Sequence, residues 1–232
     1  MPWTTCYFGV RRGSAMFLSK ILKIICRIKP ARSGGSSSAA GSGTPTSTMV
    51  ALVVEHQSQT HWCWAAVSAS VARFFNAGTG WTQCKVANQI WSRQDCCGGA
   101  AISACNNDSY LDLALRAVRC FDRMTNSVAS FIEVTNELAS GEPVCVRTQW
   151  GRQGGGHFLA IRGVKTSISG RELYLIDDPI FGRQQVPRMK FETDYRGSGI
   201  WTHTYYVKNG GAGGGAAPPV GQQSDYPDSL GG

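Results

Sequence analysis

Residues 57–75 read QSQTHWCWAAVSASVARFF, and the fold prediction starts from this stretch. From Cys63 onward, apolar residues recur at the spacing of one helix face. The residues on that face are Val67, Val71, Phe74 and Phe75. The run Asn76-Ala77-Gly78 follows and is typical of a helix end. The sequence therefore predicts a helix over 63–75 with Cys63 as its first residue.

Beyond this helix the apolar pattern changes along the chain from helical to extended. Further helices are predicted over 84–92, 109–119 and 127–140. Strands are predicted over 143–149, 157–164, 171–177, 184–191 and 200–208. Runs of helices followed by runs of strands are typical of an α+β fold with an antiparallel sheet. We therefore expect an N-terminal helical half packed on a C-terminal antiparallel sheet.

Composition divides the 232 residues into four parts. Residues 1–32 form a basic extension, and residues 33–48 form a Gly/Ser-rich linker with nothing to bury. Residues 49–209 carry the periodic apolar pattern and have the size of one domain. Residues 210–232 form a Gly-rich tail that we expect to be disordered.

The net charge of +8 is concentrated near the N-terminus. Residues 1–48 hold seven Lys or Arg and no acidic residue, whereas residues 49–209 hold 16 basic and 13 acidic residues. The charge of the folded part therefore gives no reason to expect a nucleic-acid partner. No stretch approaches the roughly 18 apolar residues that cross a bilayer, so we expect no transmembrane span.

Residues 16–30 predict a short cationic amphipathic helix, with Leu18, Ile21 and Leu22 among its apolar positions. Such a helix suits contact with an anionic membrane surface or a role as an export signal. An inert extension is the alternative, and Met16 is an alternative start of the protein.

Cys63 is the first candidate for a reactive residue. At the start of a helix, its sulfur would lie where free backbone N–H groups and the helix dipole stabilise a thiolate. A thiolate attacks a carbonyl carbon far more readily than a thiol does. The alternative is a buried structural cysteine, which is common and inert.

Two further residues could act beside such a nucleophile. Gln57 lies on the loop that enters the helix, where its side-chain NH2 could stabilise a developing oxyanion. His157 follows Gly154-Gly155-Gly156 and opens the strand HFLAIRGV, so its imidazole could face a cleft. Taken singly, each has an ordinary alternative as a solvated loop glutamine or a surface histidine.

The register of one predicted hairpin favours an acidic partner for His157. If the strands 157–164 and 171–178 pair across a symmetric turn, Val164 faces Arg171 and His157 faces Asp178. Cross-strand neighbours share one face of the sheet and lie close enough for a hydrogen bond. Asp178 is therefore favoured as the residue that orients His157. Asp177 is the fallback, because one residue of slip reverses the faces.

Four motifs in this order resemble a known family. They are Gln57 followed by HWCWAA, then GEPVCV at 141–146, GHFLAI at 156–161 and IDDP at 176–179. Together they resemble the papain-like cysteine peptidases, and most closely the compact bacterial branch. That branch includes the peptidases that remove double-glycine leader peptides and the papain-like effector proteases of plant pathogens. The resemblance covers roughly residues 50–208.

The resemblance implies a papain-like fold and hydrolysis of peptide bonds through a thioester acyl-enzyme. Carried over by position, it implies Cys63 as nucleophile, His157 as general base and then acid, Asp178 as orienting residue and Gln57 as oxyanion donor. It implies a protein or peptide substrate and no cofactor or metal, and we expect a monomer. An acyltransferase or deamidase with the same triad, and a non-catalytic papain-like binding module, are the alternatives.

Six other cysteines lie in the folded part, and an even set beside a free nucleophile suggests disulfides. They are Cys84, Cys96, Cys97, Cys105, Cys120 and Cys145. Adjacent Cys96 and Cys97 are not expected to bond to each other, and Cys105 is a suitable partner for one of them. Free buried thiols and a zinc site are the alternatives.

The extension, the linker and the cysteines together favour a protein exported or secreted from a bacterium, because disulfides persist in oxidising compartments. A cytoplasmic location is the alternative.

Overall fold

A computed structural model describes residues 45–98, 102–151 and 154–211. The predictions for the basic extension, for contact of residues 16–30 with a membrane and for the tail beyond residue 211 lie outside these residues. No helix among the described residues is long and apolar enough to span a membrane.

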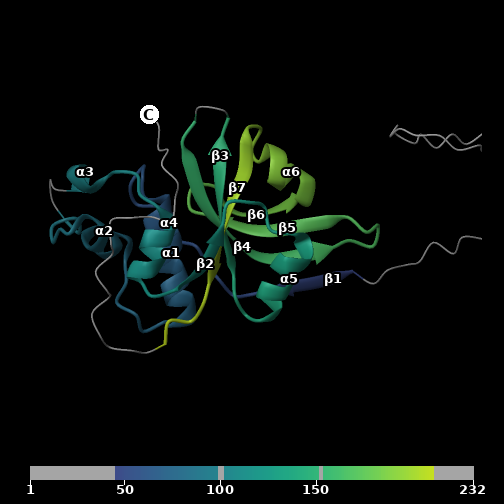
Figure 1. Cartoon of the computed structure of the whole chain (residues 1–232), viewed down its shortest axis with the longest axis horizontal. Coiled ribbons are helices and arrows are strands. Elements are labelled where there is room, and N and C mark those ends of the chain that lie inside the picture. The colour runs from purple at the N-terminus through teal and green to yellow at the C-terminus, as the bar shows by residue number, and fades with distance from the viewer. Residues whose placement is uncertain (1–44, 99–101, 152–153, 212–232) are drawn as a thin grey trace, which may run out of the picture. The chain divides into compact units, whose positions relative to one another are not determined.

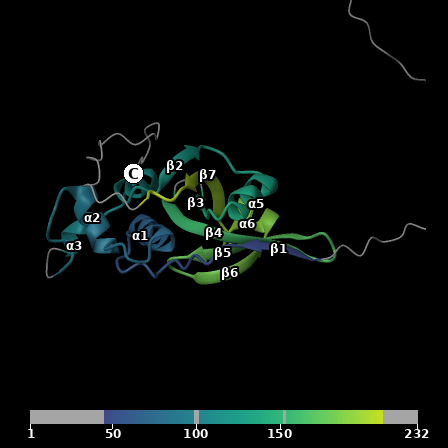
Figure 2. The ribbon, with the colours of Figure 1, turned by 90° about the horizontal axis from the view of Figure 1, so that it is seen from below.

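The first half of the described chain is helical. Its helices are α1 (Cys63–Phe75), α2 (Gln83–Trp91), α3 (Ile102–Cys105) and α4 (Leu111–Ala117). Figures 1 and 2 show α1, α2, α3 and α4 grouped on one side of the sheet. The predicted bounds of α1 are confirmed, and α2 differs from its prediction by one residue at each end. The four-residue helix α3 was not predicted.

The helix α1 is central to the fold. Its first ten residues are all buried, because they are small or apolar on every face, and Ala65, Ala66 and Ala69 allow close packing. Neighbouring elements contact α1 from both halves: α2 and α4 among the helices, and β4 (Gly156–Thr166) in the sheet. Because of this packing, the first residue of α1 lies where the two halves meet.

The second half of the described chain forms most of a seven-stranded sheet in which all pairs are antiparallel. The other strands are β1 (Thr46–Met49), β2 (Phe121–Thr125), β3 (Val144–Trp150), β5 (Glu172–Asp178), β6 (Gly182–Pro187) and β7 (Gly199–Val207). The order is β2-β7-β3-β4-β5-β6, and β1 pairs with β4 outside this path. The α+β prediction, with helices packed on an antiparallel sheet, is confirmed.

Two strands were not predicted. Residues 46–48, at the end of the predicted linker, lie in β1, which pairs with β4 from Thr46 opposite Thr166 to Met49 opposite Gly163. The strand β2 alternates poorly, because Asp122 and Arg123 are adjacent and both are exposed.

The prediction of a strand over 184–191 is wrong in its second half. The strand β6 ends at Pro187, and the helix α6 (Arg188–Asp194) follows. Pro187 lacks a backbone N–H and has a fixed φ, which suits the residue before a first helical turn. The helix α6 buries Phe191 against the rings of Tyr174 and Trp201, at centroid distances of 5.5 Å each.

The helices α4 and α5 are shorter than predicted. The helix α5 (Phe131–Ala139) begins after Ser130, whose hydroxyl accepts a hydrogen bond from the backbone N–H of Glu133. It ends near Gly141, which has a φ of 86° and so favours glycine. Such a cap fixes the start of a helix more sharply than apolar periodicity does.

Replacing Phe191 by Ala is expected to lower the free energy of unfolding by about 3–5 kcal/mol, because it leaves a cavity among buried rings. Urea unfolding of the purified protein measures this change. The control is Met189→Ala in the same helix, where the side chain is 67% exposed and the expected change is within about 0.5 kcal/mol. Equal losses for the two variants would contradict the packing described for α6.

Candidate active site

Cys63 is the first residue of α1, and it is buried and not disulfide-bonded. Trp62 precedes it, and the indole N–H of Trp62 donates to the backbone oxygen of Cys105 at 2.8 Å. Cys105 is in turn bonded to Cys96. The first backbone N–H groups of a helix have no partner within the helix, so those of α1 are directed toward the space in front of Cys63.

His157 lies on β4 and Asp178 at the end of β5, and their side chains are in contact. Nε2 of His157 is 3.0 Å from Oδ2 of Asp178, and both side chains are almost fully buried. Cys63 also lies close enough to the side chain of His157 to raise its pKa. Since Nε2 faces Asp178, Nδ1 is the ring nitrogen left for the sulfur. The structure thus brings together Cys63, His157 and Asp178 from three elements far apart in sequence.

The predicted hairpin register is wrong, although it placed Asp178 on the correct face. Val164 pairs with Tyr174, three residues from the predicted partner Arg171, because β4 extends to Thr166 before the chain turns. Between Ile161 and Gly163 the register then shifts by one residue.

The three-residue displacement and the one-residue register shift together leave each side chain on the predicted face of the sheet. Beyond the shift, Ala160 pairs with Asp177, so the neighbouring Asp178 lies on the face shared by Leu159 and His157. His157 and Asp178 are therefore diagonal neighbours rather than a directly opposed pair. A diagonal contact of this kind lies within reach of an imidazole ring.

His157 and Asp178 each stabilise the charged form of the other. Burial by itself would lower the pKa of His157, but hydrogen bonds to Asp178 and Cys63 outweigh it and raise the pKa to about 9. Burial by itself would raise the pKa of Asp178, but the hydrogen bond to His157 and its positive charge hold this pKa below the ordinary value. Backbone N–H groups of Phe181 and Ile180 act on Asp178 in the same direction. The pair is therefore an imidazolium and a carboxylate at neutral pH.

Asp177, the fallback partner, points away from His157 and has a structural role. Its Oδ2 accepts hydrogen bonds from the backbone N–H of Val54 at 3.0 Å and from Nε of Arg183 at 3.2 Å. Arg183 also donates to the backbone oxygen of Leu52. Asp177 thereby ties the segment before α1 to the sheet.

Gln57 is buried beside this site, but its amide is turned toward its own loop. Nε2 donates to the backbone oxygens of Gln59 at 2.9 Å and Thr60 at 2.7 Å. Oε1 is buried and has no hydrogen-bond partner among the described residues. The backbone N–H of Gln57 donates to the oxygen of Pro179, which directly follows Asp178.

The loop around Gln57 is held by a residue that the sequence analysis did not consider. Gln83, the first residue of α2, accepts from the backbone N–H of Ser58 at 2.8 Å and donates to the oxygen of His56 at 2.8 Å. It therefore holds the backbone on both sides of Gln57. No sequence pattern pointed to it, since a glutamine at a helix start is common.

Three aromatic residues that the sequence analysis did not single out surround His157. Trp150, at the end of β3, stacks on the imidazole at a centroid distance of 5.8 Å, and Phe181 approaches it edge-on at 6.4 Å. Tyr195, just after α6, donates from its hydroxyl to Oδ2 of Asp178 at 2.8 Å. Trp150 could have been proposed from its place at the hairpin before His157, whereas Tyr195 carries no local signal.

His61 and His203 lie in other surroundings. Nδ1 of His61 lies 3.0 Å from Asp108, and both side chains are at least half exposed. For His203, burial and the positive charge of Arg147 lower the pKa to about 4, so this ring is neutral at neutral pH.

Four of the six candidate disulfide cysteines are paired, as Cys84–Cys97 and Cys96–Cys105. The prediction for Cys120 and Cys145 is wrong, since both are free and buried. Cys120 precedes β2 and Cys145 lies in β3, and the sheet places β7 between those strands. Strands separated by one other strand lie roughly 9–10 Å apart, which exceeds the Cα separation that a disulfide bridges.

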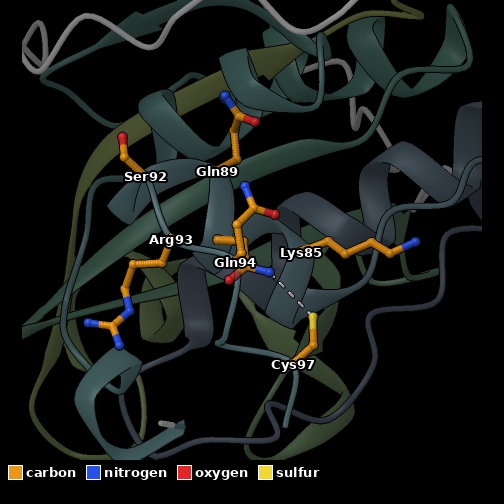
Figure 3. A pocket seen from close by; sticks show the side chains of 7 residues that line it. Lys85, Gln89, Ser92, Arg93, Gln94 and Cys97 are labelled. Carbon is orange, nitrogen blue, oxygen red and sulfur yellow. Dashed lines mark hydrogen bonds between the residues drawn. The ribbon is translucent and has the colours of Figure 1, made fainter.

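A polar hollow of about 590 Å³ lies over α2 and the loop after it, with Lys85, Arg93 and Cys97 in its lining (Figure 3). Lys85 Nζ donates to the backbone oxygen of Gly80, and Arg93 forms two hydrogen bonds with Asp95. Cys97 is in a disulfide. The described lining therefore offers neither an unpaired cation nor a free thiol.

Replacing Asp178 by Asn removes the negative charge beside His157, so the pKa of His157 should fall from about 9 toward 6.5. NMR titration of the histidine ring protons measures this, and the chain has only four histidines to assign. In the matched control Asp177→Asn, the acceptor for Val54 remains and the pKa of His157 should stay near 9. A larger fall in the Asp177 variant would contradict the assignment of partners.

Comparison with known proteins agrees with this geometry. The model of the Peptidase_C39-like family matches residues 51–202. This range includes the helix α1, the strands β2 to β6, the first residues of β7, and the three residues brought together at the start of α1. No curated protein matches the sequence. The fold of N-terminal helices on an antiparallel sheet is the papain-like arrangement of cysteine peptidases. The chain therefore belongs to the Peptidase_C39-like family, whose members are cysteine peptidases.

Proposed function

We propose that the protein is an endopeptidase that cleaves protein or peptide substrates through the triad Cys63, His157 and Asp178. The observation that carries this proposal is that Cys63, His157 and Asp178 lie together, with His157 hydrogen-bonded to Asp178 and its pKa raised by Cys63. Membership of a peptidase family gives the class of substrate.

In the resting pair, the former thiol proton of Cys63 is held on Nδ1 of His157, and in the first step the Cys63 thiolate attacks the peptide carbonyl carbon. The imidazolium then gives this proton to the leaving amine as the C–N bond breaks, which leaves a thioester on Cys63. In the second step, His157 takes a proton from water, and the resulting hydroxide attacks the thioester. The C–S bond then breaks, which releases the acid product and restores the thiolate of Cys63 beside the protonated His157.

The developing oxyanion lies in front of the start of α1 in this mechanism. Backbone N–H groups of Cys63 and its neighbours stabilise it, and each well-placed donor contributes about 3–4 kcal/mol. Gln57 joins them by exchanging one of its hydrogen bonds to Gln59 or Thr60 for one to the oxyanion. Its buried position beside Pro179 supports this role.

We also propose that the protein acts after export from the producing cell. The disulfides Cys84–Cys97 and Cys96–Cys105 support this, because disulfides persist in oxidising compartments. Recovery of the protein from the cytoplasmic fraction alone, with these cysteines reduced, would overturn this proposal.

Replacing Cys63 by Ala is expected to abolish cleavage of a fluorescence-quenched peptide library, with a loss of at least about 10³-fold, because the attacking atom is gone. The same variant should lose covalent labelling by a thiol-directed peptidyl inhibitor. Cys145→Ala, which removes a free buried thiol outside the site, should retain both.

The products of this assay separate the alternatives. New peptide amines without added amine indicate hydrolysis, whereas amide products that appear only with an added amine indicate acyl transfer. A wild-type protein that neither cleaves nor labels under mild conditions that keep the disulfides intact would contradict the proposal and favour a binding module.

The pH dependence of kcat/KM should show an alkaline limb near pH 9. Below this pH His157 is protonated and can deliver a proton to the leaving amine, and above it the proton is lost. Initial rates across pH 6–11 measure the limb, and Asp178→Asn should move it to lower pH. If the limb stays in place in Asp178→Asn, it does not report the loss of the His157 proton, and the assignment would be contradicted.

A further inference from the structure

Asp178 accepts four hydrogen bonds, which fill the acceptor positions of a carboxylate. Oδ1 accepts from the backbone N–H groups of Ile180 at 2.7 Å and Phe181 at 3.0 Å. Oδ2 accepts from Nε2 of His157 at 3.0 Å and from the hydroxyl of Tyr195 at 2.8 Å. Tyr195 and His157 therefore share one oxygen, and the charge on that oxygen is divided between them.

The direction of the Tyr195 hydroxyl is fixed by a second residue. Gln184 on β6 donates from Nε2 to the Tyr195 oxygen at 3.0 Å, so the hydroxyl proton is directed to Asp178. Burial and the negative charge of Asp178 raise the pKa of Tyr195 far above its ordinary value. The hydroxyl therefore remains a donor over the whole pH range in which enzymes act.

The ring of Tyr195 is held as firmly as its hydroxyl. It packs against Phe191 at a centroid distance of 5.3 Å and stacks with Trp150 at 6.1 Å, and Trp150 also stacks on His157. Two backbone hydrogen bonds join Tyr195 to Gly199, at 2.8 and 2.7 Å. A side chain at Gly199 would meet Trp150 and the backbone of Tyr195 at about 3 Å, so this contact requires glycine.

We propose that Tyr195 is a positioning residue of the triad, which holds Asp178 toward His157 and limits how strongly the carboxylate retains the imidazolium proton. This inference rests on the proposed function. Titratable groups that face the pair from the described elements are Cys63 on α1 and Tyr195 after α6, with Arg196 acting on the Tyr195 hydroxyl.

The physical consequence follows from the shared oxygen. Without the tyrosine hydroxyl, Oδ2 carries more negative charge toward His157, and the imidazolium becomes more stable. The proton would then leave His157 at a higher pH. A lost hydrogen bond to a charged group corresponds to about 1–2 pH units for the group that loses it, here Asp178. Only part of this reaches His157 through the shared oxygen, so the expected upward shift is about 0.5–1 pH unit.

The test is the pH dependence of Cys63 alkylation by iodoacetate in the full chain, followed by mass spectrometry of the peptide that contains Cys63. The imidazolium attracts this anionic reagent to the thiolate, so the rate rises when the ion pair forms and falls when His157 loses its proton. In Tyr195→Phe, the midpoint of the falling limb should move up by about 0.5–1 pH unit relative to the wild type.

The matched control is Tyr174→Phe, which removes the hydroxyl of another buried tyrosine bonded to a carboxylate, that of Glu192 at 3.2 Å. Its falling limb should coincide with that of the wild type. Gln184→Leu, which leaves the Tyr195 ring in place, should move the limb in the same direction as Tyr195→Phe by a smaller amount. Near-ultraviolet circular dichroism checks that each variant is folded.

The outcomes distinguish this inference from the proposed function. A wild-type protein without a bell-shaped rate at Cys63 would overturn the proposed function. A bell-shaped wild-type profile that Tyr195→Phe leaves unchanged or moves to lower pH would overturn the role of Tyr195 alone. An equal shift in Tyr174→Phe would also overturn it.

Discussion

Much of this structure is arranged so that Asp178, a buried carboxylate, keeps its negative charge. Burial opposes ionisation, and four hydrogen-bond donors with the charge of His157 overcome it. These donors come from β4, from the turn after β5 and from the residue after α6. The sheet, its turn and α6 are therefore held together at the point where the imidazole must be oriented.

Cys63, the proposed nucleophile, comes from the other half of the molecule. The helix α1 is packed between its neighbouring helices and β4, so its first residue lies directly against the oriented histidine. Two disulfides stiffen the region of α2 and α3, and Trp62 bonds to Cys105 within it. The position of Cys63 therefore depends on covalent links in the helical half, and that of His157 on the sheet.

Sequence alone predicted the parts of the site that follow from local rules. The bounds of α1 followed from apolar periodicity, and the face of Asp178 followed from alternation along a strand. The pairing itself could not be predicted, because the extension of β4 to Thr166 and the register shift between Ile161 and Gly163 depend on tertiary packing. Tyr195 and the orientation of the Gln57 amide were equally out of reach, since both are set by residues distant in sequence.

The most direct test of the account is a crystal structure of the full chain after reaction with a peptidyl aldehyde, which forms a hemithioacetal with a catalytic cysteine. The account predicts a covalent bond from the aldehyde carbon to Sγ of Cys63, the adduct oxygen at the start of α1, and His157 between the sulfur and Asp178. An adduct on another cysteine, or a His157 ring turned away from Cys63 with its bond to Asp178 broken, would contradict it.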